Sequence, residues 1–195
     1  MPISPLRNPV AVIVLGLLSE QSLHPYAMRA LMKERGYDRL TRRGETSVYD
    51  VTVRLVDHEL VAVEDSFHDG RRPQRTVYRI TTAGRATLQD WLRATLVDPE
   101  SRDSFTSGLS FMYSLPRGEV ISCLKERCAR LAELIARADA GVAGALDQGV
   151  PPIFLSEEHY AQALRRAELD WLRAFVASVE SGDLDWPEPA AAAPA

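Results

Sequence analysis

The chain has 195 residues, with 23 basic and 27 acidic side chains, 46% hydrophobic residues and two Cys. This is the composition of a globular protein of one domain or two small ones, and two cysteines exclude a disulfide scaffold. The longest apolar run, residues 10–18, is too short to span a membrane and lacks the flanks of a secretion signal, so we expect a cytoplasmic protein.

The charge of the chain is distributed unevenly. Residues 1–89 carry 13 basic and 10 acidic side chains, whereas residues 90–195 carry 10 and 17. The net charge of −4 by itself argues against binding of nucleic acid. The arginines of the first half are clustered, however, at 39–43 and 71–79, and such clusters favour a surface that binds phosphate.

Two helices are predicted in the first part of the chain. One covers residues 9–20, because Asn8 is a favourable N-cap and Pro9 suits the first helical position, although the Val and Ile residues would also suit a strand. The next begins at Pro25 and ends before Gly36, a typical C-cap. We expect its apolar face to consist of Ala27, Ala30 and Leu31.

A third helix is predicted over residues 46–59, after a polar, Arg-rich loop at 38–45. Apolar residues recur there at helical spacing, and Thr46 or Ser47 can cap the helix. A strand is the alternative, because apolar or aromatic residues alternate with polar ones from Tyr49 to Leu55. The alternation fails at residues 56–57, and the segment is long for one strand.

A β-hairpin is predicted to follow. Residues 60–64 and 76–80 have the composition of strands, and Asp69 with Gly70 is a strong turn signal between them. The tip of this hairpin holds Arg71, Arg72 and Pro73.

The second half of the chain is predicted to be helical, over residues 82–97, 103–115, 116–147 and 156–181. The third of these has a heptad seam typical of a coiled coil: Ile121, Leu124, Cys128, Leu131, Ile135, Ala138, Val142 and Ala145. The last has a similar stripe: Tyr160, Leu164, Ala167, Trp171 and Ala174. We expect a domain at 1–90, a helical domain at 91–182 and a disordered tail at 183–195.

The order of these elements is that of a winged helix-turn-helix, a mainly α fold with a small two-stranded wing (α+β). In such a fold the third helix lies in the major groove of double-stranded DNA, with its N-terminal residues toward the bases. The arginines of the hairpin tip then meet the backbone or a narrow minor groove. The candidate DNA-binding residues are Arg42, Arg43, Thr46, Ser47, Arg54, Arg71, Arg72 and Arg75.

Each of these candidates has a simpler interpretation. The arginines of the hairpin tip would also suit a solvated turn, and Thr46 and Ser47 would also serve as helix caps. Arg54 either reaches a phosphate or pairs with Asp50 four residues earlier. A module that binds a protein through the same fold, without DNA, is the alternative function.

Three stretches resemble the PadR family of transcriptional regulators. They are LGLLSEQSLHPYAM (15–28), SVYDVTVRLVDHELV (47–61) and GRRPQRTVYRITTAGRATLQDWL (70–92). Further on, LSFMYSLPRGEV and RRAELDWLRAFV are similar to the family's longer, helical dimerisation domain. The resemblance implies a homodimeric repressor and points Tyr49 toward DNA. Glu45 and Asp50 depart from the family's pattern and repel phosphate, so the operator sequence is not carried over.

A homodimer is expected because helix-turn-helix regulators usually read two half-sites as symmetric dimers. The heptad seam and the last helix are the candidate interface, although the seam could also pack within one chain. The proposed interface residues are Leu124, Cys128, Leu131, Ile135 and Trp171.

An effector site is the remaining candidate. Trp91, Phe105, Tyr113 and Trp171 could line a pocket for a small molecule, or they could simply be core. The resemblance implies phenolic effectors, but no residue selects them. The four His are scattered and the two Cys lack partner ligands, so we expect no metal and no cofactor. Because no nucleophile elbow, P-loop or HExxH pattern is present, we do not expect an enzyme.

Overall fold

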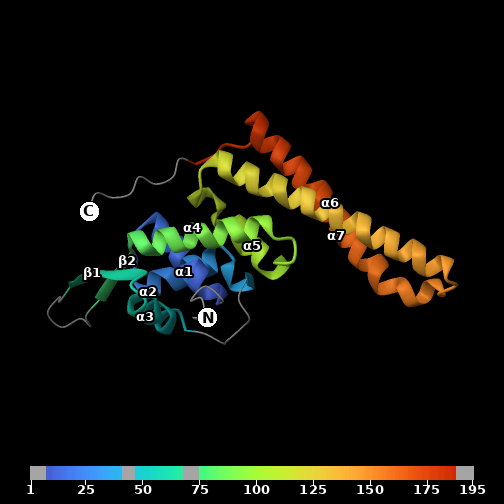
Figure 1. Ribbon diagram of the computed structural model, residues 1–195. Coiled ribbons are helices and arrows are strands. Elements are labelled where there is room, and N and C mark those ends of the chain that lie inside the picture. Colours follow the sequence, from blue (N-terminus) through green and yellow to red (C-terminus); the bar gives the residue numbers. More distant parts are fainter. Residues whose placement is uncertain (1–7, 41–46, 68–74, 188–195) are drawn as a thin grey trace. The chain divides into compact units, whose positions relative to one another are not determined.

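Helix α1 (Pro9–Glu20) is the centre of the first part of the computed structural model, which describes residues 8–40, 47–67 and 75–187. The Val10 N–H donates to Asn8 Oδ1 at 2.9 Å, which confirms the predicted cap, and Pro9 occupies the first turn. Every residue from Val10 to Ser19 is buried. A helix that is apolar all round can be stable only inside other elements, and α1 contacts α3, α5 and β2 (Figure 1).

Helix α2 (Pro25–Glu34) turns a different face inward from the one predicted. Pro25, Met28 and Met32 are buried, whereas Ala30 is exposed and Ala27 and Leu31 are only half-buried. The prediction was wrong because it followed the alanines, while the longer methionine side chains bury more apolar surface and fill irregular gaps. Arg35 is the C-cap and Gly36, at φ +68°, turns the chain into the 3-10 helix η2 (Tyr37–Leu40).

Helix α3 (Val48–Asp57) confirms the predicted helix, two residues shorter at each end, and the strand alternative is wrong. Val48, Val51 and Leu55 are buried as the spacing predicts. Thr52 is also buried, and its Oγ1 donates to the Val48 carbonyl at 2.7 Å and lies 3.9 Å from the Met28 sulfur. These contacts pack α3 against α2, as in a helix-turn-helix.

The chain leaves α3 through Glu59, which has φ +59° without being glycine. The Leu60 N–H donates to the Leu55 carbonyl at 2.9 Å across this turn, in the pattern of a left-handed helix cap. An L-residue with a Cβ is strained in this region of φ, and glycine is not.

We therefore expect Glu59→Gly to raise the free energy of unfolding by up to about 1 kcal/mol, because the relief of strain exceeds the added entropy of the unfolded chain. Urea unfolding followed by circular dichroism measures this. Arg79→Gly, at an exposed strand position paired regularly with Ala62, is the control and should lower the stability. A loss with Glu59→Gly as well would contradict the assigned backbone conformation.

Strands β1 (Val61–Phe67) and β2 (Arg75–Ile80) pair antiparallel and form the two-stranded wing. Both are longer than predicted, because pairing starts at Val61 opposite Ile80 and continues to Phe67 opposite Arg75. A bulge interrupts the register between Val63 and Asp65. This extra residue shifts the alternation of faces, which is why the sequence pattern ended the first strand early.

Helix α4 (Thr82–Val97) begins directly after the wing. Leu88, Leu92 and Leu96 are buried, and Trp91 is half-buried. The Thr81 Oγ1 accepts from the Gly84 N–H at 2.9 Å and donates to the Glu59 carbonyl at 2.8 Å. These bonds fix the start of α4 to the end of α3.

Helix α5 (Arg102–Phe111) and the 3-10 turn η3 (Met112–Ser114) replace the single helix predicted over 103–115. Phe105 and Leu115 are buried, whereas Leu109 and Met112 are only half-buried. Phe111 is fully buried. Its ring fills the space above Gly16, where a Cβ would lie only 2.3 Å from the Phe111 ring.

The second part of the chain is a helical hairpin of α6 (Arg117–Asp147) and α7 (Ser156–Ser181), joined through the 3-10 helix η4 (Pro152–Leu155). The two helices lie side by side in Figure 1. The described residues up to Thr95 form one compact unit with Arg102–Leu115, and Leu96–Ser101 with Pro116–Pro187 form another. No helix within the described ranges is long and apolar enough to cross a bilayer.

A buried arginine joins three segments of the hairpin unit. Arg127 of α6 is fully buried, and its Nε donates to Glu168 Oε1 of α7 at 2.7 Å. Its Nη1 donates to the carbonyl of Asp98, in the segment that precedes α5. The heptad pattern did not predict a charged residue inside this contact.

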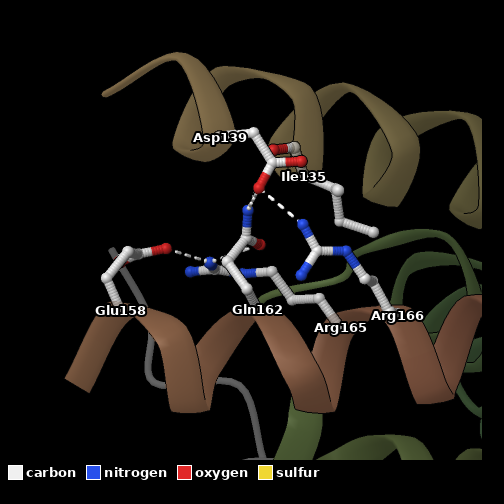
Figure 2. Close-up of polar contacts among 6 residues, drawn as sticks. All are labelled: Ile135, Asp139, Glu158, Gln162, Arg165 and Arg166. Carbon is white, nitrogen blue, oxygen red and sulfur yellow. Dashed lines mark hydrogen bonds and ion pairs between the residues drawn. The ribbon is translucent and has the colours of Figure 1, made fainter. Parts of the chain in front are cut away.

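A polar cluster continues the contact between α6 and α7 (Figure 2). The buried Gln162 side chain donates to the Ile135 carbonyl and to Asp139 Oδ1, each at 2.9 Å. Arg166 also donates to Asp139, and this hydrogen bond holds the pKa of that carboxyl below its ordinary value. Only one position of α7 along α6 lets the buried Gln162 amide make both hydrogen bonds, so the cluster fixes the register of α7 on α6.

Candidate nucleic-acid interface

The outer face of α3 is the candidate surface for DNA. It carries Tyr49, which is 58% exposed, Val53, which is 37% exposed, and the exposed side chains of Asp50, Arg54 and Asp57. The opposite face is packed in the core, so the orientation of α3 is fixed. The side chains of Tyr49 and Val53 are thus exposed to water, while the opposite face of the helix is buried.

The first turn of α3 offers hydrogen-bond donors. Ser47 is the exposed N-cap residue, and its side chain makes no capping hydrogen bond. The hydroxyl and the first N–H groups of the helix are therefore available to an anion, and the helix dipole favours negative charge there. Of the two roles predicted for Ser47, the side-chain cap is not formed, and the role of phosphate donor stays a prediction.

Arg54 lies on the outer face of α3, one turn after Asp50. Among the described residues the structure records no ion pair between Arg54 and Asp50, so the guanidinium is not held by the carboxylate in the way that the sequence allowed. The other predicted contact residues lie at the edge of the described segments or outside them. Arg75 is the first residue of β2, and Arg42, Arg43, Thr46, Arg71 and Arg72 lie outside the described residues.

A cluster of polar and aromatic side chains contacts the end of α2 and the following 3-10 helix η2. Arg35, at the end of α2, donates to both carboxylate oxygens of Glu20 at 2.6 and 2.8 Å. The Tyr113 hydroxyl of η3 donates to the same carboxylate at 2.5 Å. Tyr37 of η2 contacts Phe111, with ring centroids 5.2 Å apart. The turn that leads toward α3 is therefore held by residues that lie after α4 in the sequence.

The ionisation of this cluster follows from its contacts. Burial disfavours the Glu20 carboxylate, but the hydrogen bonds from Arg35 and Tyr113 outweigh burial and hold the pKa of Glu20 below its ordinary value of 4.5. Burial and the bond to Glu20 raise the pKa of the Tyr113 hydroxyl, which stays a donor. No local spacing relates Glu20, Arg35 and Tyr37, so this cluster could not be predicted from the sequence.

We expect Tyr113→Phe to lower the free energy of unfolding by about 1–2 kcal/mol at neutral pH, because it removes a hydrogen bond to a charged group. A carboxyl whose folded pKa is lowered stabilises the protein above its ordinary pKa, and this stabilisation is lost as the pH falls through the folded pKa. The difference from the unaltered chain should therefore shrink as the pH falls below the ordinary pKa of 4.5. Tyr26→Phe, at an exposed site, is the control; a pH-independent cost would contradict the role of Glu20.

The residues proposed for an effector pocket are placed differently from one another. Phe105 is buried in α5, Trp91 is half-buried in α4, and Tyr113 is bonded to Glu20. Trp171 belongs to the other unit, where it is 46% exposed and stacks on Phe175 with centroids 5.0 Å apart. The role of these residues stays a prediction.

The residues proposed for a dimer interface also divide into groups. Leu124 and Leu131 are buried within the chain, where α6 packs against α7, and Cys128 and Ile135 are half-buried. Packing within the chain, the alternative considered above, thus accounts for the first half of the heptad seam. The exposed apolar stripe lies instead on α7 and comprises Tyr160, Leu164, Ala167, Trp171 and Ala174.

Residues 14–90 match the family model of the transcriptional regulator PadR-like family. The match begins in α1 and covers α2, α3, both strands of the wing and the first half of α4. This segment belongs to the PadR-like family. Helices α5, α6 and α7 follow the PadR-like segment and lie outside the matched residues. The resemblance to the PadR family that was found in the sequence is confirmed for this segment. The predicted mainly α fold with its two-stranded wing is confirmed as well.

Solved structures show weaker likenesses over more of the chain. Bacillus subtilis PadR in complex with operator DNA is 19% identical, with 87% of this chain and 98% of that chain covered and a TM-score of 0.40. Bacillus subtilis PadR in complex with p-coumaric acid is 19% identical, with 89% and 99% covered and a TM-score of 0.39. A PadR-like transcriptional regulator from Bacillus cereus is 16% identical, with 89% and 99% covered and a TM-score of 0.39. No curated protein matches the chain. The family match therefore carries the assignment.

Proposed function

We propose that the protein is a transcriptional regulator, and specifically a repressor, that binds an inverted-repeat operator as a homodimer. The observation that carries this proposal is the exposed face of α3, which lies within a segment matched to a family of transcriptional regulators. On this proposal α3 enters the major groove, and Ser47 and Tyr49 of its first turn lie next to the phosphates and bases. The wing contributes Arg71, Arg72 and Arg75 to the backbone.

The dimer would form through the exposed stripe of α7. A row of apolar residues that includes Leu164, 42% exposed, and Trp171, 46% exposed, is costly in water and can be covered by the same row on a second copy. The small residues Ala167 and Ala174 allow the two helices to approach closely. This interface replaces Leu124 and Leu131 in the proposal, because those side chains are already buried.

A matched pair of variants tests the interface. Ala167 and Ala177 are both exposed on α7, but the ten residues between them correspond to roughly 280° of rotation, so Ala177 lies off the stripe. We expect Ala167→Glu to convert the dimer to monomers in analytical ultracentrifugation, and Ala177→Glu to leave it dimeric. Equal behaviour of the two variants would place the interface elsewhere.

Selection of random duplex DNA on the purified protein tests the function. We expect an enriched inverted repeat whose half-sites are about one helical turn, ~34 Å, apart. If each protomer contacts about four or five phosphates, the logarithm of the affinity should fall with the logarithm of the salt concentration with a slope of roughly −7 to −9. No enrichment from a folded dimer would overturn the proposal in favour of a protein-binding module, which the acidic Asp50 and Asp57 on α3 would suit.

Release from DNA by a small molecule completes the proposal. A ligand that stabilises a dimer with another spacing of its recognition helices must weaken operator binding by the same factor by which DNA weakens ligand binding. Addition of phenolic acids to the protein–operator complex, with affinity as the measurement, tests the class of effector that the resemblance implies.

A further inference from the structure

The first turn of α3 carries a carboxylate on the face that would enter the groove. Asp50 is the third residue of the helix, is exposed, and forms no ion pair among the described residues. Val53 and Arg54 follow one turn later on the same face. A negative charge at this position opposes the phosphates of DNA, so it weakens binding unless it meets a hydrogen-bond donor.

The major groove offers only two such donors. They are the N4 amino group of cytosine and the N6 amino group of adenine. Adenine presents the N7 acceptor beside N6, which would face the second carboxylate oxygen and repel it, because an ionised carboxylate only accepts hydrogen bonds. Cytosine presents its amino group without that acceptor on the same base. The chemistry of the side chain therefore selects cytosine.

We propose that Asp50 is a specificity-determining residue that reads a cytosine in each half-site of the operator. This inference rests on the proposed function, since it requires α3 to lie in the major groove. Asp50 occupies the N-terminal part of α3, which is the part of a recognition helix that contacts base edges. Val53, with its exposed methyl groups, is placed to contact a thymine methyl or another apolar edge beside it.

The competing interpretation is that Asp50 only stabilises the positive end of the helix dipole. A charge with that role affects the stability of α3 and the overall affinity for DNA, but it has no effect on which base is preferred. Base preference at one position of the operator therefore separates the two roles.

The experiment is selection of random duplexes on the full-length protein and on three variants. We expect the unaltered chain to enrich cytosine at one position of each half-site, with a preference of about tenfold in competition titrations. Asp50→Asn should shift that position to adenine, because an amide donates and accepts and so matches N7 and N6. Asp50→Ala should relax that position alone. Asp57→Asn is the control, because it removes an exposed carboxylate at the other end of the same helix, and this variant should retain the preference for cytosine.

Each failure has a separate meaning. If the unaltered chain enriches no DNA, the proposed function fails. If it enriches an operator and both Asp50 variants retain the same base at every position, the inference about Asp50 is overturned and the helix-dipole role stands. Thermal unfolding of each variant checks the fold, and the near-isosteric Asp50→Asn keeps the test decisive if Asp50→Ala unfolds.

Discussion

Replacement of Gly84 by Ala should lower the free energy of unfolding of the winged helix by about 2–3 kcal/mol. A Cβ on Gly84 would lie 2.0 Å from the carbonyl oxygen of Leu60 and 2.9 Å from Cγ1 of Ile80. The Leu60 carbonyl already accepts from the Thr81 N–H at 3.1 Å, so it cannot move without loss of that bond. Ala is otherwise preferred to Gly in a helix by about 1 kcal/mol, and the clash must exceed this gain.

Gly141 provides the matched control for Gly84. It lies in the interior of α6, and a Cβ there would meet no atom within 4 Å. Gly141→Ala should therefore raise the stability by up to about 1 kcal/mol through helix propensity alone. Urea unfolding of both variants at one protein concentration measures the two effects. A stabilising Gly84→Ala would show that α4 does not lie against the end of α3.

Removal of either partner of the buried ion pair should have the largest effect in the helical hairpin. Arg127→Met or Glu168→Leu is expected to cost about 3–5 kcal/mol, because each removes the partner of the other charge, and Arg127 is fully buried while the Glu168 side chain is only 19% exposed. The double variant Arg127→Met/Glu168→Leu should lie much closer to the unaltered chain, since two apolar residues require no desolvation of charge. Chemical unfolding of the four proteins forms a double-mutant cycle.

The exposed pair of Lys125 and Glu180 is the control for this cycle. Lys125 Nζ and Glu180 Oε1 are 2.6 Å apart, but the side chains are 57% and 44% exposed. Solvent screening limits such a pair to about 0–1 kcal/mol, so Lys125→Met should change little. If Arg127→Met cost no more than Lys125→Met, the buried arginine would not hold α6, α7 and the segment at Asp98 together.

The elements of this fold could be predicted where local chemistry determines them. The bounds of α1 and α7 matched the sequence prediction, because α1 has a strong cap in Asn8 and Pro9 and α7 follows the break at 149–152. The wing was found from its turn signal. Periodicity also identified the buried side of α3, since Val48, Val51 and Leu55 are all large and apolar.

The missed features depend on contacts between distant residues. Nothing near Phe111 in the sequence indicates that its ring is received by Gly16, and nothing near Arg127 indicates that Glu168 neutralises it. The apolar stripe from Tyr160 to Ala174 was found, but periodicity alone did not tell which apolar face of α7 packs inside the chain. For the candidate site, the sequence placed Tyr49 and Arg54 on α3 but could not identify the support from Glu20, Arg35 and Tyr113.

The contact of Phe111 with Gly16 determines where a minimal winged-helix fragment can end. A chain cut after α4, near the end of the family match, would lose Phe111 and leave an apolar notch on α1 open to water. It would also lose Tyr113, so that the Glu20 carboxylate would keep Arg35 as its donor but lose the tyrosine. A fragment that extends to Leu115 retains both. The boundary for autonomous folding therefore lies about one helix beyond the boundary that sequence similarity suggests.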